Sequence, residues 1–470
     1  MRRNAAFLLA GRLASAMTTV LVLAVVSRTR GPAALGEVGL GLAIGTIAAT
    51  VSDLGTASLL VREAARDRRT TRSMIAAGLV ARIVVGPFVL AAAWLVGVLS
   101  GAEAPAVVLL VAAGLVAQQT AELTRSAFNA QQRMAISGGH AVVENLAWAA
   151  VVSGALLLGV DLTTTFLLGL AVWLASVAGG FILIRLFRLL ATGDGAPRPV
   201  GEIVRIALPF GAFSLIGIVY NRIDTVLLGL LLPAGGLVAA GSYYAAARLI
   251  AAFEYLPDAL SRAAFPEISK LAVQDPVRVR TVVGATATSL LALACLGPVV
   301  FVTGADTLMA LLLGATAGPS SVVLAVLSLV LPFRFLAYLF GMTLTSSDAQ
   351  GRRVLAASLA LVAVLTIDLV GIPLFGIGAA VAGSLAAAAI LFSTYAVSVA
   401  RRFGSIGLRP TTTAAILGAM VVAIGSGLVL GTVVSQPLAA AAATAVYVVV
   451  IGAGPLRPIV RRGPAVVESR

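Results

Sequence analysis

Two charged residues of opposite sign interrupt a long apolar stretch near the middle of the chain. Arg222 and Asp224 are the only charges in residues 206–247, and both lie in the segment VYNRIDTVLLGLL. A charge near the centre of a bilayer costs roughly 2.5–3.5 kcal/mol, so such residues usually mark a substrate or ion pathway. The two residues lie roughly 200° apart around a helix, so they cannot face one partner. We expect a polar cavity in a transporter, with Arg222 facing the substrate and Asp224 coupling to an ion or anchoring its helix.

Further arginines lie inside apolar segments rather than in loops. Arg248 and Arg334 lie near the middle of their segments, whereas Arg12 and Arg82 lie closer to an end, where a side chain can extend to water. Arginine recognises phosphate through bidentate, charge-assisted hydrogen bonds. Arg222, Arg248, Arg334, Arg82 and Arg12 therefore predict an anionic substrate such as a lipid pyrophosphate.

Acidic residues are embedded in the same way. Glu254 and Asp258 are four residues apart, so they share one face of a helix, and Arg262 follows one turn later. This group predicts either a structural ion-pair network or a proton or sodium site. Asp224, Glu254, Asp258 and Asp53 are the candidates for ion coupling or structural pairing.

The chain lacks the motifs of most enzymes. His140 is the only histidine and Cys295 the only cysteine, and Walker motifs, metal-ligand clusters and nucleophile triads are absent from the sequence. We therefore expect no catalytic residues, no cofactor and no metal site. Energy for transport must then come from an ion or substrate gradient, or from a partner.

Composition identifies the elements that carry these residues. The 470 residues are 60% hydrophobic and 11% charged, with a mean hydropathy of +1.06, whereas soluble domains are about 25% charged. Continuous apolar runs of about 20 residues predict membrane-spanning helices rather than barrel strands. The predicted fold is an all-α integral membrane protein with about fourteen transmembrane helices. The expected spans are 5–26, 37–60, 74–99, 105–127, 137–159, 163–187, 203–232, 236–264, 281–302, 318–345, 353–371, 376–399, 413–433 and 437–454.

Basic residues are distributed unevenly among the loops. The formal net charge is +14, with Lys270 the only lysine. One alternate set of loops holds most of the arginines, including Arg62, Arg66, Arg68, Arg69 and Arg72, whereas the opposite set holds only Arg28 and Arg30. Cytoplasmic loops carry such an excess, so both termini are expected in the cytoplasm.

An internal repeat predicts two lobes. A shift of 205 residues pairs Gly36 with Gly241 and Asp53 with Asp258, each in the second helix of its lobe. The expected parts are an N-lobe of six helices (1–190), a cytoplasmic connector (191–202), a C-lobe of six helices (203–400), two C-terminal helices (401–454) and a basic cytoplasmic tail (455–470).

Three prolines lie within the expected spans. Pro209, Pro257 and Pro332 each remove a backbone hydrogen bond and can bend a helix. They are candidate hinges for alternating access, or else static kinks.

Several longer segments resemble a known family. They are LGEVGLGLAIGTIAATVSDLGTASLLVREAA, ALPFGAFSLIGIVYNRIDTVLLGLL with LPDALSRAAFPEISKL, and LPFRFLAYLFGMTLTSSDAQGRR with GIGAAVAGSLAAAAIL. They resemble the polysaccharide biosynthesis flippases of the multidrug/oligosaccharidyl-lipid/polysaccharide exporter superfamily, most distinctively at Asn-Arg-Ile-Asp, residues 221–224.

This resemblance implies two pseudo-symmetric lobes around a central cavity in a bacterial cytoplasmic membrane. It implies that an undecaprenyl-diphosphate-linked oligosaccharide is flipped for surface polysaccharide biosynthesis. The expected partners are this substrate, membrane lipids, H⁺ or Na⁺, and a polysaccharide polymerase or glycosyltransferases, with no nucleic acid. The alternatives are a lipid II flippase, a cation-coupled multidrug antiporter, a membrane glycosyltransferase and a non-transporting scaffold.

Overall fold

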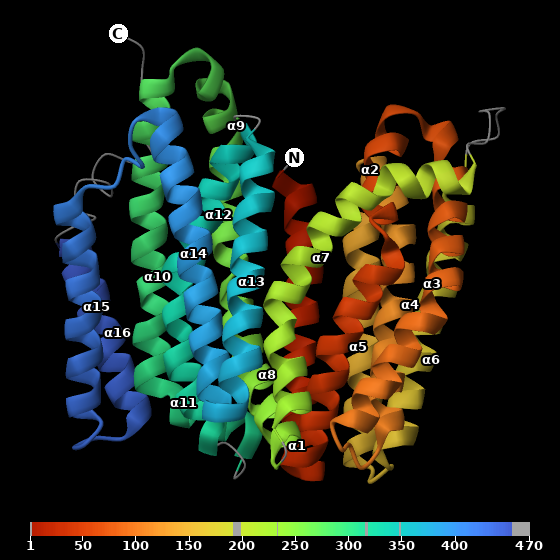
Figure 1. Ribbon diagram of the computed structural model, residues 1–470, viewed down its shortest axis with the longest axis horizontal. Helices are drawn as coiled ribbons and strands as arrows, with labels where there is room; N and C mark the ends of the chain where they lie inside the picture. Colours follow the sequence, from red (N-terminus) through yellow and green to blue (C-terminus); the bar gives the residue numbers. More distant parts are fainter. Residues whose placement is uncertain (1, 191–198, 233, 315–317, 347–348, 454–470) are drawn as a thin grey trace. The chain divides into compact units, whose positions relative to one another are not determined.

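A computed structural model describes residues 2–190, 199–232, 234–314, 318–346 and 349–453. All regular secondary structure in these residues is helical, as the apolar segments predict (Figure 1). Twelve of the helices described are long and apolar enough to cross a membrane. The protein is therefore an all-α, multi-pass membrane protein, and the predicted fold class is confirmed.

The number of spans differs from the expected fourteen for two reasons. The first two expected spans are counted together in α1 (Arg2–Asp53), although its backbone leaves the helical conformation at Gly31 (φ 84°, ψ −174°), which divides α1 into two helices across a kink. The last expected span forms α16 (Gln436–Ala453), whose apolar part, Gln436–Gly452, is shorter than the other spans. Neither difference removes an expected apolar segment, and the described residues of each segment are helical.

The other helices follow in chain order. They are α2 (Thr56–Arg66), the 3₁₀ turn η1 (Arg68–Thr70), α3 (Thr71–Leu99), α4 (Pro105–Ala130), α5 (Met134–Leu157), α6 (Leu162–Leu186), α7 (Val200–Leu231), α8 (Gly236–Phe253), α9 (Tyr255–Gln274), α10 (Pro276–Leu313), α11 (Gly318–Leu327), the 3₁₀ turn η3 (Ser328–Val330), α12 (Leu331–Ser346), α13 (Gln350–Phe375), α14 (Ile377–Phe403) and α15 (Pro410–Leu430).

The helices pack into two compact units. Unit 1 comprises Met1–Ala245, Leu312–Thr316 and Asp368–Ala380, and unit 2 comprises Ala246–Leu311, Ala317–Ile367 and Val381–Arg470. The predicted lobes divide the chain by its sequence repeat, whereas the two units divide it by contacts between residues. By contacts, α7 and the first part of α8 belong with α1–α6. Residues 191–198 of the predicted connector and the predicted tail 455–470 lie outside the described residues.

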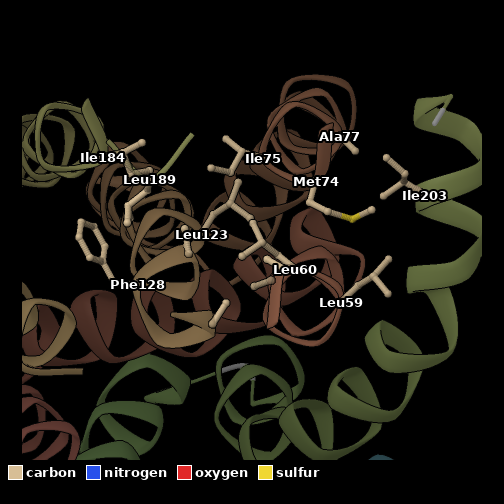
Figure 2. Packing of buried hydrophobic residues seen from close by; sticks show 14 of the residues in the cluster. Leu59, Leu60, Met74, Ile75, Ala77, Leu123, Phe128, Ile184, Leu189 and Ile203 are labelled. Atoms are coloured by element: carbon tan, nitrogen blue, oxygen red, sulfur yellow. The ribbon is translucent and has the colours of Figure 1, made fainter. Parts of the chain in front are cut away.

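The core of unit 1 shows why α7 is grouped with the first six helices. Leu59 and Leu60 of α2, Met74 of α3 and Leu123 of α4 are fully or almost fully buried in one apolar cluster (Figure 2). Ile203, in the first turn of α7, is buried in the same cluster. Apolar burial therefore attaches the start of α7 to α2 and α3.

A glycine pair brings the backbone of α7 against the junction of α1 and α2. Gly55, which precedes α2, has φ 81°, and a Cβ added there would lie 2.4 Å from the backbone nitrogen of Gly211. A Cβ on Gly211 would lie 2.6 Å from the carbonyl carbon of Leu54. Neither position has room for a side chain, so close backbone contact depends on both glycines.

The two glycines paired by the repeat also contact each other. A Cβ on Gly241 of α8 would lie 2.7 Å from the backbone nitrogen of Gly36 in α1. A Cβ on Gly36 would lie 2.1 Å from the carbonyl oxygen of Leu237, so the close approach of α1 and α8 depends on both glycines.

Unit 2 contains the last two helices. α15 and α16 pack against each other, and a Cβ on Gly427 of α15 would lie 2.8 Å from the Cβ of Ala443 in α16. The Tyr447 hydroxyl of α16 donates to the backbone oxygen of Ala292 in α10 at 2.7 Å. These contacts attach the C-terminal pair to α10.

Candidate functional site

The charged pair on α7 contacts two neighbouring tyrosines of α8. The Arg222 guanidinium lies over the ring of Tyr244, 5.4 Å from its centroid, and the Tyr243 hydroxyl donates to Asp224. The two charges thus contact different side chains, as their angular separation requires. Among the described residues no carboxylate forms an ion pair with Arg222, so its charge is balanced only by the face of an aromatic ring.

Asp224 has an acidic neighbour from a distant part of the chain. Asp368 of α13 is fully buried and lies beside Asp224, which is 2% exposed. The buried oxygens of Asp368 have no partner among the described residues other than Asp224. Two carboxyl groups in an apolar interior cannot both carry a charge without a cation. The pair can therefore hold a proton or a small cation.

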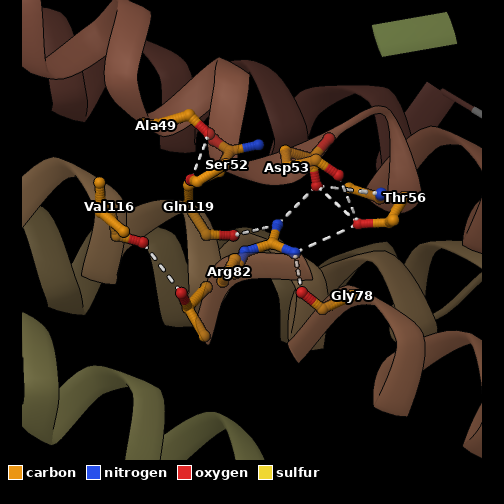
Figure 3. Close-up of polar contacts among 10 residues, drawn as sticks. Ala49, Ser52, Asp53, Thr56, Gly78, Arg82, Val116 and Gln119 are labelled. Atoms are coloured by element: carbon orange, nitrogen blue, oxygen red, sulfur yellow. Dashed lines mark hydrogen bonds and ion pairs between the residues drawn. The ribbon is translucent and has the colours of Figure 1, made fainter. Parts of the chain in front are cut away.

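Arg82, predicted to bind pyrophosphate, is engaged by an acid on a neighbouring helix. Its Nη2 lies 2.5 Å from Asp53 Oδ1, and its Nη1 donates to the Gly78 carbonyl at 2.8 Å (Figure 3). Asp53 also accepts from the Thr56 hydroxyl at 3.0 Å. The side chain of Arg82 is only 4% exposed. This geometry joins the end of α1, the start of α2 and the middle of α3.

Arg334 is likewise paired, in unit 2. Its Nη1 lies 2.7 Å from Glu254 Oε1, and both side chains are partly exposed, at 16% and 21%. Arg248 is half-buried on α8, and Arg12 is exposed on α1. The side chain of Asp258 lies outside the described residues.

The three candidate hinge prolines occupy different positions. Pro209 lies inside α7, whereas Pro257 and Pro332 lie in the first turns of α9 and α12. The expected span 236–264 is divided at Glu254 into α8 and α9, and 318–345 is interrupted by η3. Glu254 (φ −70°, ψ −9°) and Leu331 (φ −58°, ψ −47°) keep right-handed helical backbone angles, so all three prolines stay candidates for hinges or static kinks.

The sequence interpretation missed two features. Asp368 was recognisable as a buried acid, but nothing local indicated that it lies beside Asp224. Arg125 is absent from the predicted candidates, yet it is buried between Glu122 and Glu144. Its spacing of three residues from Glu122 is the signal that could have identified this ion pair.

Membrane-length helices that carry buried charges, some paired and others not, are typical of polytopic transporters. The chain belongs to a particular family of this kind, described as polysaccharide biosynthesis protein, whose model matches residues 1–272. No curated protein matches the chain.

Solved structures share the fold at low sequence identity. A lipid II flippase, MurJ, in an inward closed conformation is 11% identical, with a TM-score of 0.72 over 96% of this chain and 99% of that one. The eukaryotic MATE transporter AtDTX14 is 14% identical, with a TM-score of 0.57 over 86% and 98%. A MOP superfamily transporter from Pyrococcus furiosus is 15% identical, with a TM-score of 0.57 over 85% and 95%. At these identities the likeness concerns the fold.

Proposed function

We propose that the protein flips an undecaprenyl-diphosphate-linked oligosaccharide across the bacterial cytoplasmic membrane for surface polysaccharide biosynthesis. Membership of the polysaccharide biosynthesis family supports this class of substrate. The observation that carries the proposal is Arg222, a half-buried cation on a membrane helix with no ion-paired carboxylate among the described residues. Such a guanidinium can bind a diphosphate.

The candidate arginines differ in whether their side chains are already ion-paired with an acidic residue of the protein. Arg222 has the best claim, since Arg82 and Arg334 already form ion pairs with Asp53 and Glu254. Arg334 can still reach an anion because its side chain is partly exposed. Arg248 and Arg12 remain candidates in the same role. A polysaccharide polymerase and glycosyltransferases are the partners that this function requires.

The first test replaces Arg222. Flipping of a fluorescent lipid-diphosphate oligosaccharide in proteoliposomes is expected to fall by about tenfold to a hundredfold in Arg222→Ala, because a charged hydrogen bond contributes about 1.5–3 kcal/mol. Arg205→Ala is the matched control, since Arg205 is exposed on the same helix. Full activity in Arg222→Ala would remove the proposed role of this residue.

Coupling to an ion is the second part of the proposal. Asp224 and Asp368, with the Tyr243 hydroxyl, are proposed to take up H⁺ or Na⁺, which removes the repulsion between two buried carboxylates. Asp224→Asn or Asp368→Asn leaves one carboxyl group, so flipping is expected to lose its dependence on the coupling ion. Rates measured across a pH series at constant Na⁺, and across a Na⁺ series at constant pH, identify the ion.

Glu202→Gln is the control for this experiment, because Glu202 is an exposed acid at the start of α7. It is expected to leave the ion dependence unchanged. An Asp368→Asn protein that responds to both ions as the unmodified protein does would contradict the coupling proposal.

A lipid II flippase is the second candidate, favoured by one observation. The MurJ structure covers 96% of this chain, whereas the other two structures cited cover 85–86%. Competition decides between the two substrates. Unlabelled lipid II should inhibit flipping of the oligosaccharide lipid only weakly if the first proposal is correct.

A further inference from the structure

A second buried polar network lies among α4, α5 and α6, apart from the residues discussed above. Arg125 of α4 contacts two acids, through Nε to Glu122 Oε2 at 2.7 Å and through Nη1 to Glu144 Oε2 at 2.6 Å. The Ser176 hydroxyl of α6 donates to the same Glu144 oxygen. Ser176 Oγ also lies 3.2 Å from Nε2 of His140, one turn before Glu144 on α5.

The charges in this network do not balance. Arg125 contributes one positive charge, whereas Glu122 and Glu144 contribute two negative charges. The side chain of Glu144 is 0% exposed, and its Oε1 has no hydrogen-bond partner among the described residues. Arg125 balances the buried Glu144, so the excess negative charge lies on the partly exposed Glu122, and one added proton would make the whole network neutral.

The neighbouring helices do not supply that charge. On α3, Arg82 acts electrostatically on Glu122, but its own charge is matched by Asp53. On α1, which also packs against α5, Arg12 is exposed, and it is not among the ion-pair partners of Glu122 or Glu144. Burial and Arg125 oppose an imidazolium at His140, whereas Glu144, Ser176 and Glu122 favour it.

The hydrogen bonds determine which imidazole nitrogen is open to a proton. Ser176 has one hydroxyl hydrogen, which it donates to Glu144. Nε2 of His140 must therefore carry the hydrogen in its contact with Ser176 Oγ. In the neutral ring Nδ1 is then the basic nitrogen, and it can take up a proton. The resulting imidazolium is linked to the Glu144 carboxylate by the hydrogen bonds of the Ser176 hydroxyl.

We propose that His140, Ser176 and Glu144 form a proton-binding site in unit 1, with Nδ1 of His140 as the acceptor and Glu122 as the entry point. Glu122 suits this role because its side chain is 41% exposed while Arg125 and Glu144 are buried. Occupancy changes the net charge of the α4–α5–α6 network from negative to zero. The site is separate from the acid pair on α7 and α13, and it does not depend on the identity of the transported substrate.

The sole histidine makes this site directly observable. Protein labelled with ¹⁵N-histidine and reconstituted in nanodiscs gives the signals of one imidazole, from His140. Between pH 5 and pH 9 we expect one titration, from the neutral Nε2–H tautomer to the doubly protonated ring. Glu144→Gln should move the midpoint to lower pH by about one unit or more, because a nearby carboxylate stabilises the imidazolium.

Two serine variants distinguish the effect of Ser176 on the His140 ring from a general effect of losing a buried serine. Ser176→Ala removes the hydrogen-bond acceptor of Nε2–H and is expected to abolish the preference for that tautomer while the ring still titrates. Ser153→Ala, a buried serine on α5 whose hydroxyl has no partner among the described residues, should change neither property. If Glu144→Gln does not fold, the tautomer in the unmodified protein and in Ser176→Ala still decides the question.

Three results would overturn the proposal. They are a ring that keeps one protonation state from pH 5 to pH 9, a neutral ring in the Nδ1–H tautomer, and a titration midpoint that a folded Glu144→Gln variant leaves unchanged.

Discussion

At the scale of single residues, the buried charges differ by the partners they contact. Arg82 is enclosed by Asp53, Thr56 and a backbone carbonyl, whereas Arg222 contacts only an aromatic face among the described residues. A cation that forms a buried ion pair is costly to redirect toward a ligand, because the acid it leaves would remain buried and charged. Arg82 therefore fits a structural role better than Arg222 does.

The Arg82–Asp53 pair leads to a prediction about stability. Arg82→Met leaves a buried carboxylate without a counter-charge, so the free energy of unfolding is expected to fall by about 3–5 kcal/mol. Arg82→Met combined with Asp53→Leu should recover much of that loss. The measurement is the unfolding of the purified protein in detergent.

The activity of the double variant tests the other interpretation of Arg82. A stable double variant that flips substrate at the normal rate would confirm the structural role. A stable double variant without activity would instead assign Arg82 to the substrate, as the sequence predicts.

Residue types were readable from the sequence, but residue partners mostly were not. The apolar surroundings of Arg222 and Asp224 marked them as functional candidates, and helical geometry predicted their divergence. By contrast, Asp224 meets Asp368 only because the end of α13, from Asp368 onward, belongs to unit 1, and no local pattern encodes that contact.

At the scale of elements, helix contacts in unit 1 depend on glycines at particular positions. The contact of α7 with the α1–α2 junction requires Gly55 and Gly211 together, because a methyl group on either would overlap the backbone of the other helix. On α7 the contact is made by Ala207 and Gly211, which lie on either side of Pro209. The charged pair, Arg222 and Asp224, follows further along the same helix.

Gly55→Ala is expected to destabilise the protein for two reasons. The left-handed conformation at φ 81° costs an alanine roughly 1–2 kcal/mol, and the new methyl group would also overlap Gly211 and Ala207. Gly101→Ala is the matched control, since Gly101 has φ 69° but open space around its added Cβ. Thermal unfolding should show a clearly larger loss for Gly55→Ala, and equal losses would contradict the packing argument.

Which segments are helical could be predicted from the sequence better than the residues at which each helix begins and ends. Every apolar segment is helical because length and hydropathy determine that outcome. The ends depend on tertiary packing and single backbone angles: the backbone leaves the helical conformation at Gly31, between the first two expected spans, and again at Gly55, inside the second of them.

At the scale of the whole molecule, arginine asymmetry predicts the orientation in the membrane. The segment from Arg62 to Arg72 carries five arginines at the end of α2 and around η1. The loop between α3 and α4 carries no basic residue. Because basic loops remain on the cytoplasmic side, the two segments should lie on opposite sides of the bilayer.

Cysteine labelling can test this orientation with little background, since Cys295 is the only cysteine and is buried. In intact cells, a membrane-impermeant maleimide should label Glu103→Cys. It should label Ala65→Cys, which retains every arginine, only after permeabilisation. Both positions are exposed in the structure. The reverse labelling pattern would overturn the predicted orientation and, with it, the cytoplasmic placement of the termini.

Unit 1 is formed by segments that lie far apart in the sequence, and this affects the order in which it can be assembled. Its first 245 residues leave the ribosome long before Asp368–Ala380, the segment that completes the unit. Because chains are synthesised from the N-terminus, Asp224 enters the membrane without Asp368 beside it. The acid pair thus arises late in biogenesis, after most of the polypeptide has been inserted, and an incomplete chain lacks it.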